Sequence, residues 1–185
     1  MSFDWTPHLA DQLDWHWQAQ LRPRLEGLTD DEYFWAPVPA SWNVRRRDTT
    51  PGAARQPGAG DWTVDFTFPA PAPAPVTTIA WRLAHLIVGV FGLRAAAHFG
   101  GPPVSYETYP YAGTAAGALR QLDAGYEAWM TGVRGLPNEG LAEPCGPAEG
   151  AFAQAPMADL VLHIHREAIH HGAEVSLLRD LYLRR

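Results

Sequence analysis

Apolar side chains recur at helical spacing in the first part of the chain. Between Thr6 and Gly27 an apolar residue returns every four positions, at Leu9, Leu13, Trp17, Leu21 and Leu25. This spacing predicts a helix with one buried face, which begins near Thr6 and ends at Gly27. The segment Thr29 to Glu32 has the pattern of a capping box and predicts one or two further helical turns before Pro37.

Three more long helices follow from the same kind of pattern. The second is expected from Thr77 to Phe99, and because its apolar residues cover most of its circumference, it should be buried on several sides. The third is expected from Thr114 to Arg134, with Gly135 as its C-terminal cap. The fourth is expected from about Pro156 to Leu183, after a loop over residues 139–154.

Residues 36–75 lack this pattern and are expected to form a long crossover between the first two helices. Trp62 to Phe68 alternates as a strand does, with Ser41 to Arg46 as its expected partner in a small hairpin. Asp48 to Asp61 predicts an exposed loop at the hairpin tip, and Pro69 to Pro75 a stiff extended spacer. The pattern predicts an all-α fold: a four-helix bundle in a single domain, residues 1–185, whose crossover carries a small β-hairpin.

Composition narrows the class of protein. The chain has 185 residues and a formal net charge of −6, which argues against binding to nucleic acid or to an acidic membrane surface. All 14 of its positively charged residues are arginine, which we interpret as a compositional bias and not as a functional signal. Cys145 is the only cysteine, so neither an internal disulfide nor a Cys-rich zinc site can form. The longest uncharged apolar run, Leu83 to Leu93, has 11 residues, against about 20 for a membrane-spanning helix. The start resembles no secretory signal, so we expect a soluble, cytoplasmic protein.

Histidines gather on the last predicted helix, at positions 163, 165, 170 and 171. A helical wheel places His171 on the buried face and Glu167 beside it, whereas His165 and His170 point to the flanks or to solvent. Glu167 and His171 are four residues apart, so their side chains are neighbours. A buried unpaired carboxylate would cost several kcal/mol, and a divalent cation would accept both groups. A simple charged hydrogen bond between the two is the alternative.

A metal site needs a third ligand from another helix. His85, in the middle of the most apolar helix, is the leading candidate, and His16 on the first helix is the second. His16 could instead be an ordinary core or pocket histidine. Two histidines and one glutamate leave coordination positions open, as in catalytic zinc sites.

Other site classes find no support in the motifs. The chain has no His-Glu-x-x-His peptidase motif, no phosphate-binding glycine loop and no Gly-x-Ser-x-Gly elbow. Glu167 and His170 form one Glu-x-x-His motif, but a carboxylate-bridged di-iron bundle requires a second copy. Cys145 has no obvious base nearby and is expected to be inert. The eight tryptophans are expected mainly in the core, with a ligand cage as the alternative.

Four features occur together in this chain: His16-Trp17 on the first helix, Trp81 to His85 on the second, the long crossover, and Arg166 to Glu174 on the last helix. In this combination the chain resembles the DinB-like (damage-inducible) four-helix-bundle superfamily, which also contains mycothiol-dependent maleylpyruvate isomerase. The resemblance covers nearly the whole chain. It implies one divalent metal, often zinc or nickel, held by a histidine of the second helix and by a pair four residues apart on the last.

The resemblance also implies residue roles. It gives the ligand role to His85, Glu167 and His171, with Glu167 at a position where many members have histidine and the isomerase branch has glutamate. Further residues are expected to line a pocket: His16, Trp17, Trp81 and Arg82.

The isomerase and related members use a low-molecular-weight thiol such as mycothiol or bacillithiol. The resemblance therefore implies a thiol-transferase-like enzyme, in which the metal ionises the thiol and the thiolate attacks a small-molecule electrophile near Trp17 and Trp81. The second expectation is a non-catalytic metal-binding or stress-response bundle that acts as a homodimer. An open coordination position facing a ligand-sized cavity favours the enzyme, and a closed four-ligand site favours the structural role.

Overall fold

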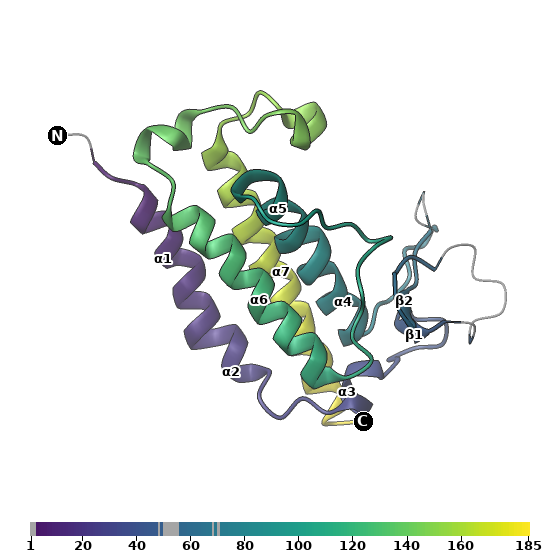
Figure 1. Cartoon of the computed structure of the whole chain (residues 1–185). Helices are drawn as coiled ribbons and strands as arrows, with labels where there is room; N and C mark the ends of the chain where they lie inside the picture. The colour runs from purple at the N-terminus through teal and green to yellow at the C-terminus, as the bar shows by residue number, and fades with distance from the viewer. Residues whose placement is uncertain (1–2, 48, 50–55, 68, 70) are drawn as a thin grey trace.

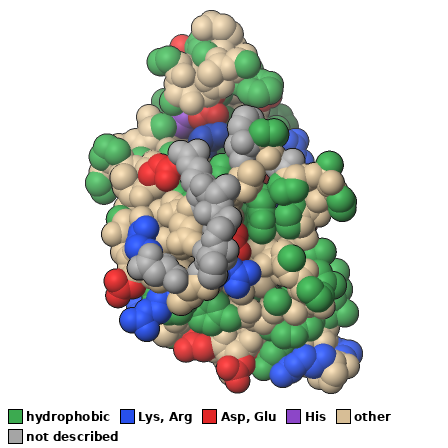
Figure 2. Space-filling model, turned by 90° about the vertical axis from the view of Figure 1, so that its right-hand side faces the viewer, with side chains coloured by type: hydrophobic (Ala, Val, Ile, Leu, Met, Phe, Trp, Pro, Cys, Tyr) green, Lys and Arg blue, Asp and Glu red, His purple; other side chains and the backbone are tan. Residues whose placement is uncertain are grey.

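The computed structural model describes residues 3–47, 49, 56–67, 69 and 71–185. Long helical segments lie side by side and form the main body, and a small two-stranded sheet stands at one side of it (Figure 1). The predicted, largely helical fold with a small hairpin is therefore confirmed. The side that carries the sheet presents positive and negative side chains interspersed over its described part (Figure 2).

The first helical segment forms where the four-residue apolar pattern predicts it. It runs through α1 (Thr6–His16), a π-helical stretch (Trp17–Leu21) and α2 (Arg22–Arg24). Its apolar stripe is buried except for Leu9, which is partly buried, and Trp17 stacks on Tyr126 with the ring centroids 3.9 Å apart. The short helix α3 (Asp30–Phe34) begins with the predicted capping box.

The second segment is the core helix of the molecule. It comprises α4 (Ile79–His85), a π-helical stretch (Leu86–Gly92) and α5 (Leu93–Phe99), and Thr78 caps its start by accepting a hydrogen bond from the backbone of Trp81. Within the described residues it is the one helix long and apolar enough to span a membrane. More than half of its most apolar 18-residue stretch is buried inside the protein, as in a core helix.

The remaining two long helices are α6 (Ala115–Arg134) and α7 (Met157–Tyr182), with bounds close to the predicted ones. The connection between them, predicted as a loop, contains two short 3-10 helices, Asn138–Ala142 and Pro147–Phe152. Both α1 and α4 pack against α6 and α7. This packing brings the last residue of α4 to the middle of α7.

The crossover between the first two segments carries the predicted hairpin. Strands β1 (Val44–Arg46) and β2 (Trp62–Val64) pair antiparallel, with Val44 opposite Val64. The second strand is shorter than predicted. Phe68 lies outside the described residues, as do half of the predicted tip loop (48 and 50–55) and Ala70 of the spacer.

The hairpin is attached to the start of α4 by hydrogen bonds. Trp42 forms a backbone bridge with Thr77, and the indole nitrogen of Trp81 donates to the carbonyl oxygen of Asp65 at 2.8 Å. Because these bonds span the two elements, the crossover is held over the first turns of α4, which carry His85.

Candidate metal centre

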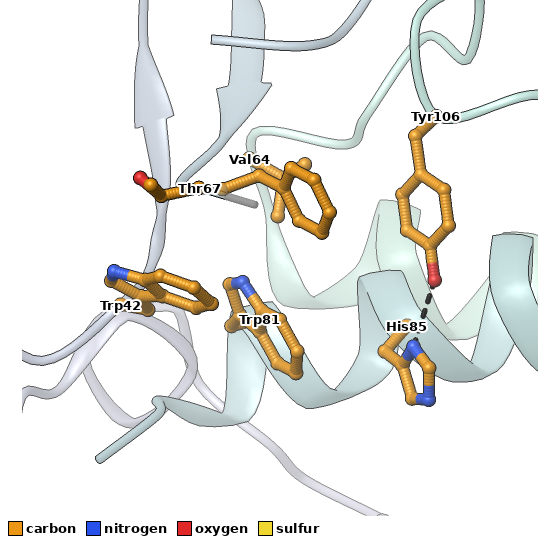
Figure 3. Close-up of a pocket in the computed structure, with 7 residues that line it drawn as sticks. Trp42, Val64, Thr67, Trp81, His85 and Tyr106 are labelled. Atoms are coloured by element: carbon orange, nitrogen blue, oxygen red, sulfur yellow. Dashed lines mark hydrogen bonds between the residues drawn. The ribbon is translucent and has the colours of Figure 1, made fainter. Parts of the chain in front are cut away.

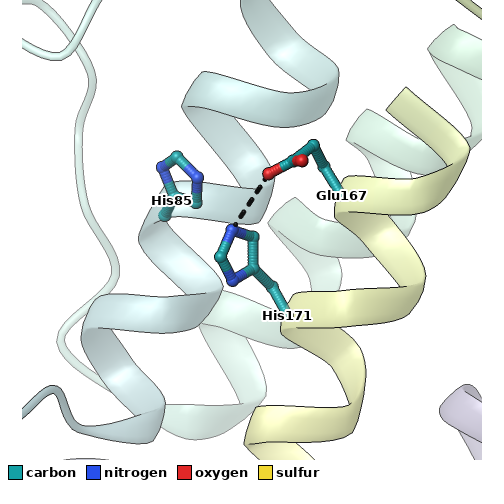
Figure 4. Close-up of side chains that lie close together, drawn as sticks. All are labelled: His85, Glu167 and His171. Carbon is teal, nitrogen blue, oxygen red and sulfur yellow. Dashed lines mark ion pairs between the residues drawn. The ribbon is translucent and has the colours of Figure 1, made fainter. Parts of the chain in front are cut away.

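Helices α4 and α7 bring three potential metal ligands together. His85, Glu167 and His171, called the donor cluster below, each offer one ligand atom, and these atoms all lie within 4.8 Å of one another. His171 Nε2 lies 3.4 Å from a carboxylate oxygen of Glu167, and the rings of His85 and His171 face each other edge to face at 4.7 Å (Figure 4). The third donor therefore comes from α4, and among the described residues His16 belongs to no such group.

The orientation of His171 is set by Glu174. A carboxylate oxygen of Glu174 lies 2.6 Å from His171 Nδ1, and since a carboxylate only accepts, Nδ1 carries the proton and donates. The Nε2 atom is then left with a lone pair on the side of Glu167. Arg82 holds Glu174 in place through an ion pair of 3.0 Å. Ligating histidines in proteins are typically oriented by such a carboxylate.

The orientation of His85 is set by Tyr106. The Tyr106 hydroxyl lies 2.8 Å from His85 Nδ1, which leaves Nε2 as the free nitrogen of the ring. Gly89, one turn further along the helix, makes this contact possible, because a Cβ there would overlap the Tyr106 hydroxyl. Burial and the neighbouring His171 and Arg82 lower the pKa of His85 to about 4, so the imidazole is neutral near pH 7, the form that binds metals.

The donor set fits a divalent cation. Two imidazoles and one carboxylate suit zinc and nickel, and three protein ligands leave positions for water or a substrate. The other oxygen of Glu167 lies 3.8 Å from His163 Nδ1 and 3.8 Å from Arg166 Nε. These distances are too long for hydrogen bonds, so the charge of this carboxylate is partly neutralised while its oxygens stay available to a metal. A second group of donors, His170, His171 and Glu174, shares His171 with the donor cluster. Its Glu174 is already bound to Arg82, and His170 is exposed, so it fits a cation less well.

An apolar pocket of about 300 Å³ opens directly beside His85. Its walls come from the crossover, from α4 and from the segment after α5 (Figure 3), and they are made by Trp42, Val64, Phe66, Thr67, Trp81, His85 and Tyr106. The Trp81 indole is stacked on the His85 ring at 5.6 Å. The donor cluster and this apolar pocket therefore share one residue, His85.

The residues predicted to line a pocket occupy different places. Trp81 lies in the wall of the apolar pocket, whereas Arg82 contacts the donor cluster through Glu174. Trp17 is 3% exposed and packs in the core, and it is not part of that wall. His16 is half-buried, and burial lowers its pKa.

The wheel-based expectation for His165 is wrong. Its side chain is buried, with the residue 5% exposed, and its ring lies edge-on to Trp129. Burial lowers the pKa of His165 to about 4. The reason is that α7 packs on α1 as well as on α4, so more than one face of the helix is covered. His170 is exposed, as expected.

Sequence reasoning assigned no role to Tyr106, Phe66, Trp42 or Glu174. Glu174 could have been found, because it stands three residues after His171 and seven after Glu167, on the same helical face. Tyr106 lies in an irregular segment between two helices, where no spacing rule applies. Phe66 follows a strand, and its direction depends on how the crossover docks onto α4.

A second cavity, of about 550 Å³, lies between α5, the second 3-10 helix and the first turns of α7. Glu149 in its wall pairs with Arg94 at 3.2 Å and with the buried side chain of His98 at 2.8 Å. Cys145 also lines it, and burial raises the pKa of this thiol, in line with the inert role expected for it.

The comparisons with known proteins give one result. A family model described as the DinB superfamily matches residues 12–175, which include every member of the donor cluster. A comparison with curated proteins finds no match, and neither does one with solved structures.

Proposed function

Because the chain belongs to the DinB superfamily, we propose that it is a divalent-metal-dependent enzyme that joins a low-molecular-weight thiol of the mycothiol type to a small electrophile. In this proposal the packed helices are the superfamily's four-helix bundle, and the protein works in the reducing cytoplasm. One observation carries the proposal: among the described residues, a cluster of three potential metal ligands adjoins a ligand-sized apolar pocket through His85. A structural metal site would be closed by four ligands.

The residues of the donor cluster are those that would hold the metal. Zinc or nickel bound there would act as a Lewis acid and lower the pKa of a thiol or a water molecule. Glu167 makes the site one charge more negative than a third histidine would, which favours retention of a divalent cation.

The surrounding residues orient the site and the reactants. Glu174 keeps His171 in the tautomer with a free Nε2, Arg82 fixes Glu174, and Tyr106 fixes His85. The apolar pocket excludes water around the electrophile. In the reaction the thiolate sulfur forms a bond to an electrophilic carbon, the leaving group departs with its electron pair, and the thiol proton passes to solvent.

The test is a transfer assay with mycothiol and 1-chloro-2,4-dinitrobenzene, in which a C–S bond forms and chloride leaves. The wild-type protein loaded with zinc or nickel should accelerate formation of the thioether, followed by its absorbance. His171→Ala should abolish metal binding and this acceleration, whereas His170→Ala, on the exposed side of the same helix, should retain both. Stoichiometric metal retained by His171→Ala would refute the ligand assignment.

A second function is favoured by a row of exposed apolar side chains on α7. The exposed positions recur along one side of the helix, at Leu162, Ile169, Leu177 and Leu181. In this alternative the chain is a non-catalytic metal-binding or stress-response bundle that acts as a homodimer through this face. Light scattering of the wild type and of Leu177→Glu tests it: a dimer that the substitution dissociates, together with no transfer activity, would favour the alternative.

A further inference from the structure

We propose that the apolar pocket binds an electrophile through a neutral aromatic group and places that group beside His85. This inference rests on the proposed function, because it names the substrate class of the same site. It is carried by the composition of the pocket walls, their closed arrangement and the charges around them.

The walls form a closed ring of aromatic side chains. Neighbouring ring centroids are 5.6 Å apart from His85 to Trp81, 5.7 Å from Trp81 to Trp42, 6.4 Å from Trp42 to Phe66 and 6.2 Å from Phe66 to Tyr106. The hydrogen bond between the Tyr106 hydroxyl and His85 Nδ1 closes the circle. In Figure 3, Trp42 and Trp81 lie on one side of the pocket, and Tyr106 and His85 on the other. An aromatic group inside this ring would find several stacked or edge-on partners.

The size of the pocket agrees with one aromatic group. An engineered apolar cavity of about 150 Å³ is enough to bind benzene. The apolar pocket, at about 300 Å³, has room for one ring with substituents or for two fused rings. A long acyl chain or a large cosubstrate would not fit inside.

The charges around the pocket select a neutral group. Among the described residues that line it, none is Asp, Glu, Arg or Lys. Burying an ion there would be costly, since no counter-ion faces it. Asp65, which precedes Phe66 on the crossover, is already paired with Arg45 at 2.8 Å.

An aromatic box can also bind a quaternary ammonium ion through cation–π contacts. The position of Arg82 argues against this occupant. Its guanidinium carbon lies 5.3 Å from the centroid of the Trp81 ring, so a cation already occupies one face of that indole. A cation in the pocket would therefore have one indole face fewer to contact, and no carboxylate in the described pocket wall would pair with it.

The experiment uses three fluorinated probes that differ in charge: 4-fluoroacetophenone, 4-fluorobenzoate and (4-fluorobenzyl)trimethylammonium. Binding is followed by ¹⁹F NMR titration of the metal-free wild type and of Glu167→Gln, so that the result does not depend on the metal. The neutral probe should bind both proteins equally well and about tenfold or more tightly than either ion.

Two substitutions assign this binding to the pocket. Phe66→Ala removes one wall and Thr67→Trp fills the space from a half-buried position; each should weaken binding of the neutral probe about tenfold or more. Trp15→Ala is the control, because Trp15 is 64% exposed on α1 and outside the pocket wall. It should leave the dissociation constant unchanged.

The outcomes separate this inference from the proposed function. Tighter binding of the cationic probe, equal binding of all three probes, no binding, or binding that both pocket variants retain would each overturn the inference. If the neutral probe binds as expected but the protein takes up no metal, the inference stands and the metal-dependent function fails. If metal binds and the neutral probe does not, the inference alone fails.

Discussion

Replacing Glu174 by glutamine tests whether the orientation of His171 governs metal affinity. Glu174 accepts from His171 Nδ1 at 2.6 Å and from Arg82 at 3.0 Å. Its side chain is 32% exposed, so solvent screens part of this interaction. Glutamine keeps the shape but loses the charge, and Arg82, 3.4 Å from His171 Nδ1, is left without its counter-ion.

Both effects weaken cation binding. Loss of such an orienting partner typically reduces metal affinity about 10–100-fold, equivalent to roughly 1.4–2.7 kcal/mol. We expect a loss in this range for Glu174→Gln, measured as the zinc dissociation constant in competition with a chromophoric chelator. Because Glu174 is at the edge of the site, the melting temperature of the metal-free protein should change little.

The matched control is Asp180→Asn, which removes an exposed carboxylate from the same helix, where it pairs with Arg24. It changes the net charge equally but lies six residues beyond Glu174, so zinc affinity should stay within about twofold of the wild-type value. Equal zinc affinity in Glu174→Gln and the wild type would refute the reasoning, because His171 would then need no orienting partner or would not be a ligand.

Three further predictions follow. Gly89→Ala should displace the Tyr106 hydroxyl and, like Tyr106→Phe, lower zinc affinity by up to about tenfold in the chelator assay. Wild-type affinity in both variants would contradict the conclusion that Tyr106 orients His85. His165 has a pKa of about 4 in the folded protein and about 6.5 in the unfolded chain, so the free energy of unfolding should fall as the pH falls between these values. Urea denaturation should show a loss of about 3 kcal/mol in the wild type that is absent from His165→Leu, and parallel pH profiles of the two proteins would be contrary evidence. Trp17→Ala should destabilise the fold by about 3–5 kcal/mol, measured by urea denaturation with zinc-free protein, yet leave zinc affinity unchanged; a small loss of stability with a large loss of affinity would place Trp17 in the site instead.

Local patterns account for most of the helices. The four-residue recurrence from Leu9 to Leu25 and the capping box at Thr29 specify their elements through contacts within a few turns. The alternation after Trp62 predicted the hairpin, although the strand ends at Val64 because the chain then turns towards α4.

The site was predictable only in part. Glu167 and His171 share a helical face, so spacing alone shows that they are neighbours. His85 comes close to them through the packing of α4 on α7, which no local pattern encodes. From the sequence it was chosen as the third ligand because it lies in the most apolar helix and because the chain resembles the DinB-like superfamily. The misplacement of His165 has the same origin, because a wheel with one buried face does not describe a helix covered on several sides.

Of the apolar pocket, sequence reasoning found Trp81 and His85 but not the rest of the wall. Trp42 and Phe66 reach His85 because the crossover docks on α4, and Tyr106 comes from a segment without regular structure. Their roles depend on tertiary contacts between segments far apart in the chain.

The most direct test of the account is the metal content of the protein, purified without a histidine tag and measured by elemental mass spectrometry, for the wild type and Glu167→Ala. The account predicts about one zinc or nickel ion per chain in the wild type and loss of that ion in the variant. No metal in either protein, even after reconstitution, would contradict it and leave Glu167 and His171 as a polar pair without a metal.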